Sequence, residues 1–251
     1  MALSAGDTSA KRPHVEILPD KSALIDRALT VVLEVIEGAI ATHDRVTLAL
    51  AGGSTPKPLY EALAQQDLPW QKFYIFWGDE RYVPIDHPDS NAGMAKMAWL
   101  DRVPIPPEQI FPMPTQFEDP QTAAQAYEQT LRTVFPGEDV PQRDLILLGM
   151  GDDGHTASLF PHTEALSVRD RLITVGNKDG QPRITFTVPL INQSKTVLFL
   201  TAGANKQHAL SQVFAAEAAA EDYPSRLIQP QGELWWLLDA QAGAPLAETI
   251  A

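Results

Sequence analysis

The stretch VTLALAGGSTP, residues 46–56, joins a continuous apolar run to a loop rich in glycine and hydroxyl groups. An apolar run of this length is typical of a strand buried on both faces of a parallel sheet. Comparable runs recur at residues 73–77, 144–148, 172–175, 196–201 and 233–239, and a short strand is expected at residues 14–18. Helical patterns lie between several of these runs. The sequence therefore predicts an α/β fold, a single doubly wound domain whose mostly parallel sheet is covered by helices on both faces.

The helices are predicted from apolar residues at helical spacing. The clearest pattern follows Pro19-Asp20, with apolar positions at Leu24, Ala28, Val31, Val35 and Ile36. Further helices are expected at residues 58–64, 92–100, 122–134 and 205–219. Six prolines within residues 103–120 exclude a helix interior or a central strand, so a surface connection is expected there. We expect residues 1–12 to form a loose tail and residues 13–251 to form the single domain.

The composition excludes several classes of function. The chain has 19 basic and 32 acidic residues, a formal net charge of −13, which argues against a nucleic-acid or anionic-membrane partner because both require a basic surface. It has no cysteine, which excludes disulfides, thiolate metal sites and cysteine nucleophiles. No apolar run is long enough to span a bilayer and the first ten residues lack the pattern of a signal peptide, so we expect a cytoplasmic protein.

Chemically distinctive loops follow four of the predicted strands. They are GGSTP (52–56), Asp79-Glu80-Arg81, GMGDDGHT (149–156) and AGANK (202–206). In an open α/β sheet, ligands bind beyond the carboxyl ends of the strands. We therefore expect these four loops to meet at one site.

The first of these loops has the composition of an anion-binding site. It offers two glycines and two hydroxyl side chains, namely Gly52, Gly53, Ser54 and Thr55. Free backbone N–H groups at the start of a helix, together with hydroxyl donors, suit a phosphate group. Lys206 and Arg183 lie near the same expected sheet edge and would add positive charge in an acidic chain. The alternatives are an ordinary capped turn and solvated surface charges.

His155 is the candidate general base. It lies in the loop after the strand at 144–148, and Asp153, two residues earlier, is a candidate for orienting it. A carboxylate beside an imidazole fixes its tautomer and stabilises the protonated form that general-base catalysis produces. The alternative is a histidine that only braces the loop. No metal-binding spacing occurs, so we expect no metal, and GMGDDG (149–154) is rejected as a dinucleotide fingerprint because its two aspartates would repel a pyrophosphate.

Six segments resemble the 6-phosphogluconolactonases in sequence and in order. They are LALAGGSTPKPLYEAL (48–63), FWGDERYVPIDHPDSNAGMA (76–95), VPIPPEQIFPMP (103–114), DLILLGMGDDGHTASLFP (144–161), RITFTVPLIN (183–192) and FLTAGANKQHAL (199–210). The resemblance implies a Rossmann-like fold and a carboxylic ester hydrolase that converts a small-molecule sugar-phosphate lactone, 6-phospho-D-glucono-1,5-lactone, to 6-phospho-D-gluconate. It implies His155 as general base, with the substrate surrounded by Gly53, Ser54, Thr55, Asp79, Arg81, Arg183 and Lys206. We expect no cofactor.

Two other functions are considered. The related glucosamine-6-phosphate deaminases and isomerases share the fold and both loops, but they typically carry an acidic residue five positions after the histidine, where this chain has Phe160. A non-catalytic sugar-phosphate sensor would carry a DNA-binding segment in front. Only residues 1–45 precede the strand that leads into the first of the four loops, so this function is not favoured. We favour the lactonase, as a monomer or a weak homodimer. The sequence leaves open whether Asp153 or Asp79 orients His155.

Overall fold

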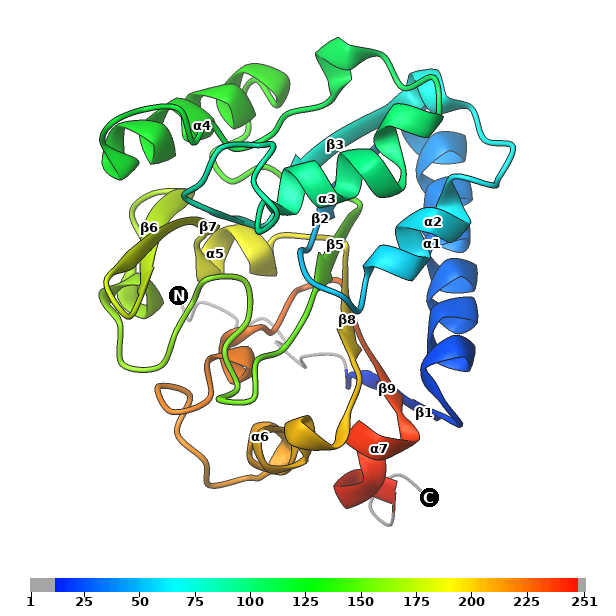
Figure 1. Cartoon of the computed structure of the whole chain (residues 1–251), viewed down its shortest axis with the longest axis vertical. Coiled ribbons are helices and arrows are strands. Elements are labelled where there is room, and N and C mark those ends of the chain that lie inside the picture. Colours follow the sequence, from blue (N-terminus) through cyan, green and yellow to red (C-terminus); the bar gives the residue numbers. More distant parts are fainter. Residues whose placement is uncertain (1–11, 248–251) are drawn as a thin grey trace, which may run out of the picture.

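The main sheet has the predicted parallel arrangement. The computed structural model describes residues 12–247, so nearly all of the expected tail at residues 1–12 lies outside the described residues. Within them, six strands form the sheet in the order β1 (His14–Leu18), β9 (Glu233–Asp239), β8 (Thr196–Thr201), β5 (Leu145–Leu148), β2 (Val46–Leu50) and β3 (Phe73–Trp77) (Figure 1). Each neighbouring pair is parallel. Every residue of β2, β5 and β8 is buried, which explains why these strands are apolar except for threonines.

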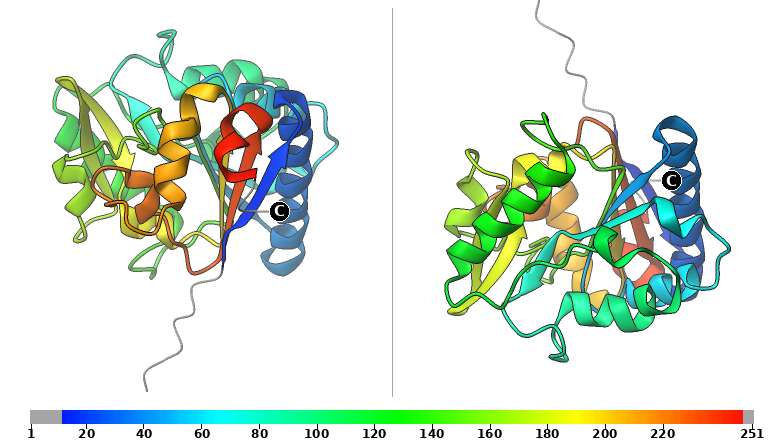
Figure 2. Two further views of the ribbon diagram at one scale, coloured as in Figure 1. Left: turned by 90° about the horizontal axis from the view of Figure 1, so that it is seen from below. Right: turned by 90° about the horizontal axis from the view of Figure 1, so that it is seen from above.

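Helices flank this sheet. The described residues form α1 (Lys21–His43), α2 (Lys57–Leu63), α3 (Asn91–Ala98), α4 (Pro120–Val134), α5 (Val188–Asn192), α6 (Gln207–Phe214) and α7 (Ala240–Gly243). Helix α1 begins after Asp20, whose carboxylate accepts a hydrogen bond from the backbone N–H of Ala23 at 2.9 Å. It covers one face of the sheet, and α6 lies with a second, smaller sheet on the opposite side (Figure 2). The predicted α/β architecture is therefore confirmed.

The second sheet is the feature that the sequence did not predict. Strands β4 (Asp79–Arg81), β7 (Gln181–Phe186) and β6 (Ile173–Lys178) pair in that order, and both pairings are antiparallel. The apolar run at residues 172–175, expected with the parallel strands, thus belongs to this sheet. A two-residue turn, Asp179-Gly180, joins β6 to β7 with positive φ at both positions, as a type I′ hairpin requires. The pairing places Arg81 directly opposite Arg183.

Two connections complete the comparison with the predicted elements. The helix expected at residues 205–219 is shorter: a 3₁₀ turn, Ala204–Lys206, precedes α6, which ends at Phe214. The guanidinium of Arg226 donates to the carbonyls of Gln212, Val213 and Ala215 at 2.6–2.8 Å, and so satisfies the end of this helix. The proline-rich segment contains no helix interior or central strand, as predicted, and its last proline, Pro120, is the first residue of α4. No helix within residues 12–247 combines the length and the apolar character needed to cross a bilayer.

Candidate active site

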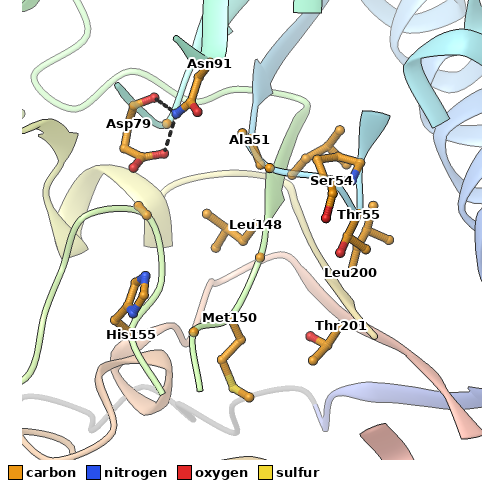
Figure 3. Close-up of a pocket in the computed structure, with 18 of the residues that line it drawn as sticks. Ala51, Ser54, Thr55, Asp79, Asn91, Leu148, Met150, His155, Leu200 and Thr201 are labelled. Carbon is orange, nitrogen blue, oxygen red and sulfur yellow. Dashed lines mark hydrogen bonds between the residues drawn. The ribbon is translucent and has the colours of Figure 1, made fainter. Parts of the chain in front are cut away.

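The four segments meet around one cavity at the carboxyl edge of the main sheet. One of them, Asp79-Glu80-Arg81, was expected to be a loop but forms strand β4, because it pairs with β7. The cavity has a volume of about 500 Å³. Nine of the ten residues suggested by the sequence line it: Gly52, Gly53, Ser54, Thr55, Asp79, Arg81, His155, Arg183 and Lys206. The tenth, Asp153, reaches the site through its hydrogen bond to His155. Ser54 and Thr55 lie on one side of the cavity and Asp79 and His155 on the other, with Leu148 between them (Figure 3).

The loop after β2 depends on its two glycines. Gly53 has a φ of +95°, which a residue with a side chain rarely adopts. A Cβ on Gly52 would lie 1.7 Å from the side-chain oxygen of Asn91, so only glycine fits against that amide. The ammonium group of Lys21 donates to the backbone carbonyl of Ser54 at 3.1 Å. These contacts hold Ser54 and Thr55 at the cavity.

His155 is fixed by its own loop. Its Nδ1 lies 2.5 Å from Oδ1 of Asp153, and its backbone N–H donates to the same oxygen at 3.1 Å. Its backbone carbonyl accepts from the N–H of Gly151 at 2.8 Å. A Cβ on Gly151 would lie 2.1 Å from Nδ1 of His155, so the glycine makes room for the imidazole ring. Within the described residues, the Nε2 nitrogen has no hydrogen-bond partner and is available to a ligand in the cavity.

The electrostatics of this pair favour an ionised aspartate. Partial burial by itself would raise the pKa of Asp153, but the hydrogen bond and the charge of His155 lower that pKa to about 2. The charge of Lys178 makes a smaller contribution to the same lowering of the Asp153 pKa. Asp153 therefore has the geometry and the charge to hold one tautomer of His155.

Asp79 has different partners. Its Oδ2 accepts a hydrogen bond from Ser158 Oγ at 2.6 Å, and its backbone carbonyl accepts from Asn91 Nδ2 at 2.9 Å. No direct hydrogen bond joins Asp79 to His155 among the described residues, so of the two candidate carboxylates only Asp153 is bonded to the imidazole. Asp79 is buried and lines the cavity from the first position of β4.

Glu80 supports the same corner of the site without facing the cavity. Its carboxylate accepts backbone N–H groups from Asn91 at 2.7 Å, Ala92 at 2.8 Å and Arg81 at 2.8 Å. Burial raises the pKa of Glu80 despite these donors. The contacts fix the start of α3, and with it the Asn91 amide that holds Asp79.

The second sheet supplies a group of basic side chains. Arg81 and Arg183 occupy opposite positions on β4 and β7, and Lys178 lies at the end of β6; all three line the cavity. Burial and the charge of Arg81 lower the pKa of Arg183. Like charges at opposite positions of a sheet are destabilising by themselves, so this arrangement indicates an anion-binding role. Lys206 lines the cavity from a different loop, beyond β8.

Lys178 and Asn91 are two of the polar cavity residues that the sequence analysis did not single out; the others are Asp152, Thr201 and Asn205. Lys178 precedes the Asp-Gly turn of the β6–β7 hairpin, and that dipeptide is a recognisable hairpin pattern. The hairpin pairs the strand that ends at Lys178 with the strand that carries Arg183, so this pattern could have placed the lysine near Arg183. Asn91 follows a helix-capping serine and gave no separate pattern. Among residues 12–247, no three histidine, aspartate or glutamate side chains are grouped as metal ligands.

Comparisons with known proteins place the chain among known relatives. The model of the family described as glucosamine-6-phosphate isomerases/6-phosphogluconolactonase matches residues 19–236. The chain is 63% identical over 236 residues to the 6-phosphogluconolactonase of Synechocystis sp., and 64% identical over 236 residues to that of Nostoc sp.; each match covers 93% of this chain and 98% of the relative.

A solved structure shares the fold. The structure of 6-phosphogluconolactonase from Trypanosoma brucei superposes with a TM-score of 0.85 at 30% identity, over 94% of this chain and 99% of that one. The matched region includes β2, β5 and β8 and the loops that follow them. The chain belongs to the glucosamine-6-phosphate isomerase/6-phosphogluconolactonase family.

Proposed function

We propose that the chain hydrolyses 6-phospho-D-glucono-1,5-lactone to 6-phospho-D-gluconate, the second step of the oxidative pentose phosphate pathway. The observation that carries the proposal is His155, held by Asp153 at 2.5 Å, beside a cavity with basic residues from two separate structural units. A base and a set of cations are what the hydrolysis of an anionic lactone requires. The names of the relatives in Synechocystis and Nostoc support the same activity.

A histidine base is sufficient for this reaction because a δ-lactone is an activated ester. Nε2 of His155 accepts a proton from a water molecule as the water oxygen attacks C1. The carbonyl electrons move to its oxygen, and the positive charge of Arg81 and Arg183 stabilises that oxyanion. When the tetrahedral intermediate collapses, the bond from C1 to the ring oxygen breaks, and the imidazolium returns its proton to that oxygen. Asp153 holds the ring in the tautomer that leaves Nε2 free to accept the proton.

The two sides of the cavity bind different parts of the substrate, the phosphate and the lactone carbonyl. We assign Ser54, Thr55 and Lys206 to the phosphate because they come from the ends of β2 and β8, the two strands that flank β5. Arg81 and Arg183 belong to the second sheet, which also carries Asp79, and we assign them to the lactone carbonyl. A phosphate held away from the reacting carbon orients the lactone for attack.

The test is hydrolysis of the freshly generated phosphorylated lactone by purified protein, with the spontaneous reaction subtracted. We expect turnover that survives treatment with a chelator, and much slower turnover of unphosphorylated gluconolactone. Release of ammonia from glucosamine 6-phosphate without lactone hydrolysis would overturn the proposal in favour of a deaminase. We also propose that the enzyme acts in the cytoplasm as a monomer or weak homodimer, which fractionation and light scattering would check.

A further inference from the structure

Phe160 touches three charged or ionisable side chains of the site. Its ring lies 4.6 Å from the His155 ring, centroid to centroid, at an interplanar angle of 47°. Lys178 Nζ lies 5.5 Å from the centroid of the same ring, and Arg183 Cζ lies 5.7 Å from it. The residue is only 5% exposed. One buried aromatic ring thus contacts both the candidate base and two of the cations.

Neither cation forms a close ion pair within residues 12–247, although the charges of Asp79, Asp89 and Glu80 act on Arg183 from beyond ion-pair distance. Among the described residues, no aspartate or glutamate lies within ion-pair distance of Lys178 or Arg183. Asp153 is close enough to Lys178 to feel its charge, yet its hydrogen bond goes to His155. The face of an aromatic ring attracts a cation without cancelling its charge.

We propose that Phe160 is a positioning residue that also sets specificity, because its ring supports the His155 imidazole and keeps Lys178 and Arg183 unpaired and available to an anionic substrate. The inference rests on the proposed function, since it takes the anion to be the phosphorylated lactone or its product. Phe160 itself takes no part in bond making or breaking.

Neither a carboxylate nor an aliphatic side chain at position 160 could replace the phenyl ring. A carboxylate there would form charge-assisted hydrogen bonds with Lys178 and Arg183 and compete with the substrate for them. It would also favour the protonated form of the neighbouring imidazole, which cannot act as a base. An aliphatic side chain would fill the space but would lack the negative face that holds the two cations.

The experiment compares Phe160→Leu, Phe160→Gln and Phe160→Glu with the wild type. Calorimetry measures the Kd of 6-phospho-D-gluconate, and thermal unfolding reports whether each variant is folded. We expect the leucine variant to bind about three- to tenfold more weakly, as the loss of two cation–π contacts predicts. The glutamate variant should bind at least about tenfold more weakly than the isosteric glutamine variant, because only the glutamate neutralises the cations.

The matched control is Phe73→Leu, which also removes a buried ring, from the amino end of β3 beside Trp70 and Trp99. It should lower the unfolding temperature without changing the Kd. Equal affinity in the wild type and all three folded variants at position 160 would overturn the inference, and so would equal losses in the glutamine and glutamate variants. Absence of lactone hydrolysis by the wild type would instead refute the proposed function, because the binding comparison does not depend on turnover.

Discussion

Replacing Asp153 by asparagine tests how much this carboxylate contributes to the stability of the fold and to the catalytic rate. The pKa of Asp153 is about 2 against an ordinary value of 3.8, a gap that corresponds to about 2.4 kcal/mol at 1.36 kcal/mol per pH unit. The side chain is 42% exposed, so solvent screening reduces this contribution to about 1 kcal/mol. Because the folded-state pKa lies below that of the unfolded chain, the contribution is present above about pH 4 and is lost as the pH falls toward 2.

The same substitution should affect catalysis more than stability. An asparagine can turn its amide N–H toward Nδ1 of His155, which would place the ring proton on Nε2 and prevent that nitrogen from accepting one. We therefore expect kcat to fall by about 100-fold, within the usual range for loss of a general base. Urea unfolding at several pH values and steady-state kinetics measure the two effects.

The control for Asp153 is a carboxylate that is also bonded to a nearby basic side chain but does not line the cavity. Asp170 is exposed and pairs with its neighbour Arg171 at 3.0 Å, so Asp170→Asn should leave kcat unchanged. The reasoning would be refuted if Asp153→Asn kept near-normal kcat. It would also be refuted if the stability difference from the wild type stayed constant between pH 5 and pH 2.

Three further predictions follow from the structure. Lys206→Ala should raise KM for the phosphorylated lactone by at least about tenfold and leave the slow hydrolysis of gluconolactone nearly unchanged, the pattern of a contact to a remote group; equal effects on both substrates would contradict it. Gly151→Ala should fold but lose most of its kcat, because the added Cβ would lie 2.1 Å from Nδ1 of His155; normal kinetics would contradict it. Asp144→Asn should lower the free energy of unfolding by about 3 kcal/mol at neutral pH, because it removes the buried partner of an ion pair. Burial by itself would raise the pKa of Asp144, but Lys195 and Thr47 outweigh that effect and hold the pKa below its ordinary value. The contribution is present above the unfolded-state pKa and is lost as the pH falls through the lower folded-state pKa, so denaturant unfolding of both proteins should converge in acid; a difference independent of pH would contradict it.

The main sheet was predictable because its central strands are buried on both faces. Burial leaves strands such as Val46–Leu50 almost wholly apolar, and the polar loops after them mark the carboxyl edge of the sheet. The second sheet was not predictable in this way. Its strand Asp79–Arg81 has three charged residues, and its pairing with Gln181–Phe186 joins segments about a hundred residues apart, for which local pattern contains no information.

The candidate site shows the same division. His155 and the loop with Ser54 lie directly after apolar runs, so sequence position alone indicated them. Lys178 depends on the hairpin and on long-range pairing, and only the structure brings it to the cavity. The choice between Asp153 and Asp79 also required distances, because both carboxylates follow apolar strands at the same edge of the main sheet.

The central claim is that His155 is the general base, and its replacement by asparagine tests this most directly. An amide keeps the size and hydrogen-bonding capacity of the position but cannot accept a proton. With spontaneous opening of the lactone subtracted, we expect His155→Asn to lower kcat by at least about 100-fold. Its Kd for 6-phospho-D-gluconate should stay within a few-fold of wild type, because the phosphate contacts lie in other loops. A folded His155→Asn protein with near-normal kcat would contradict the account.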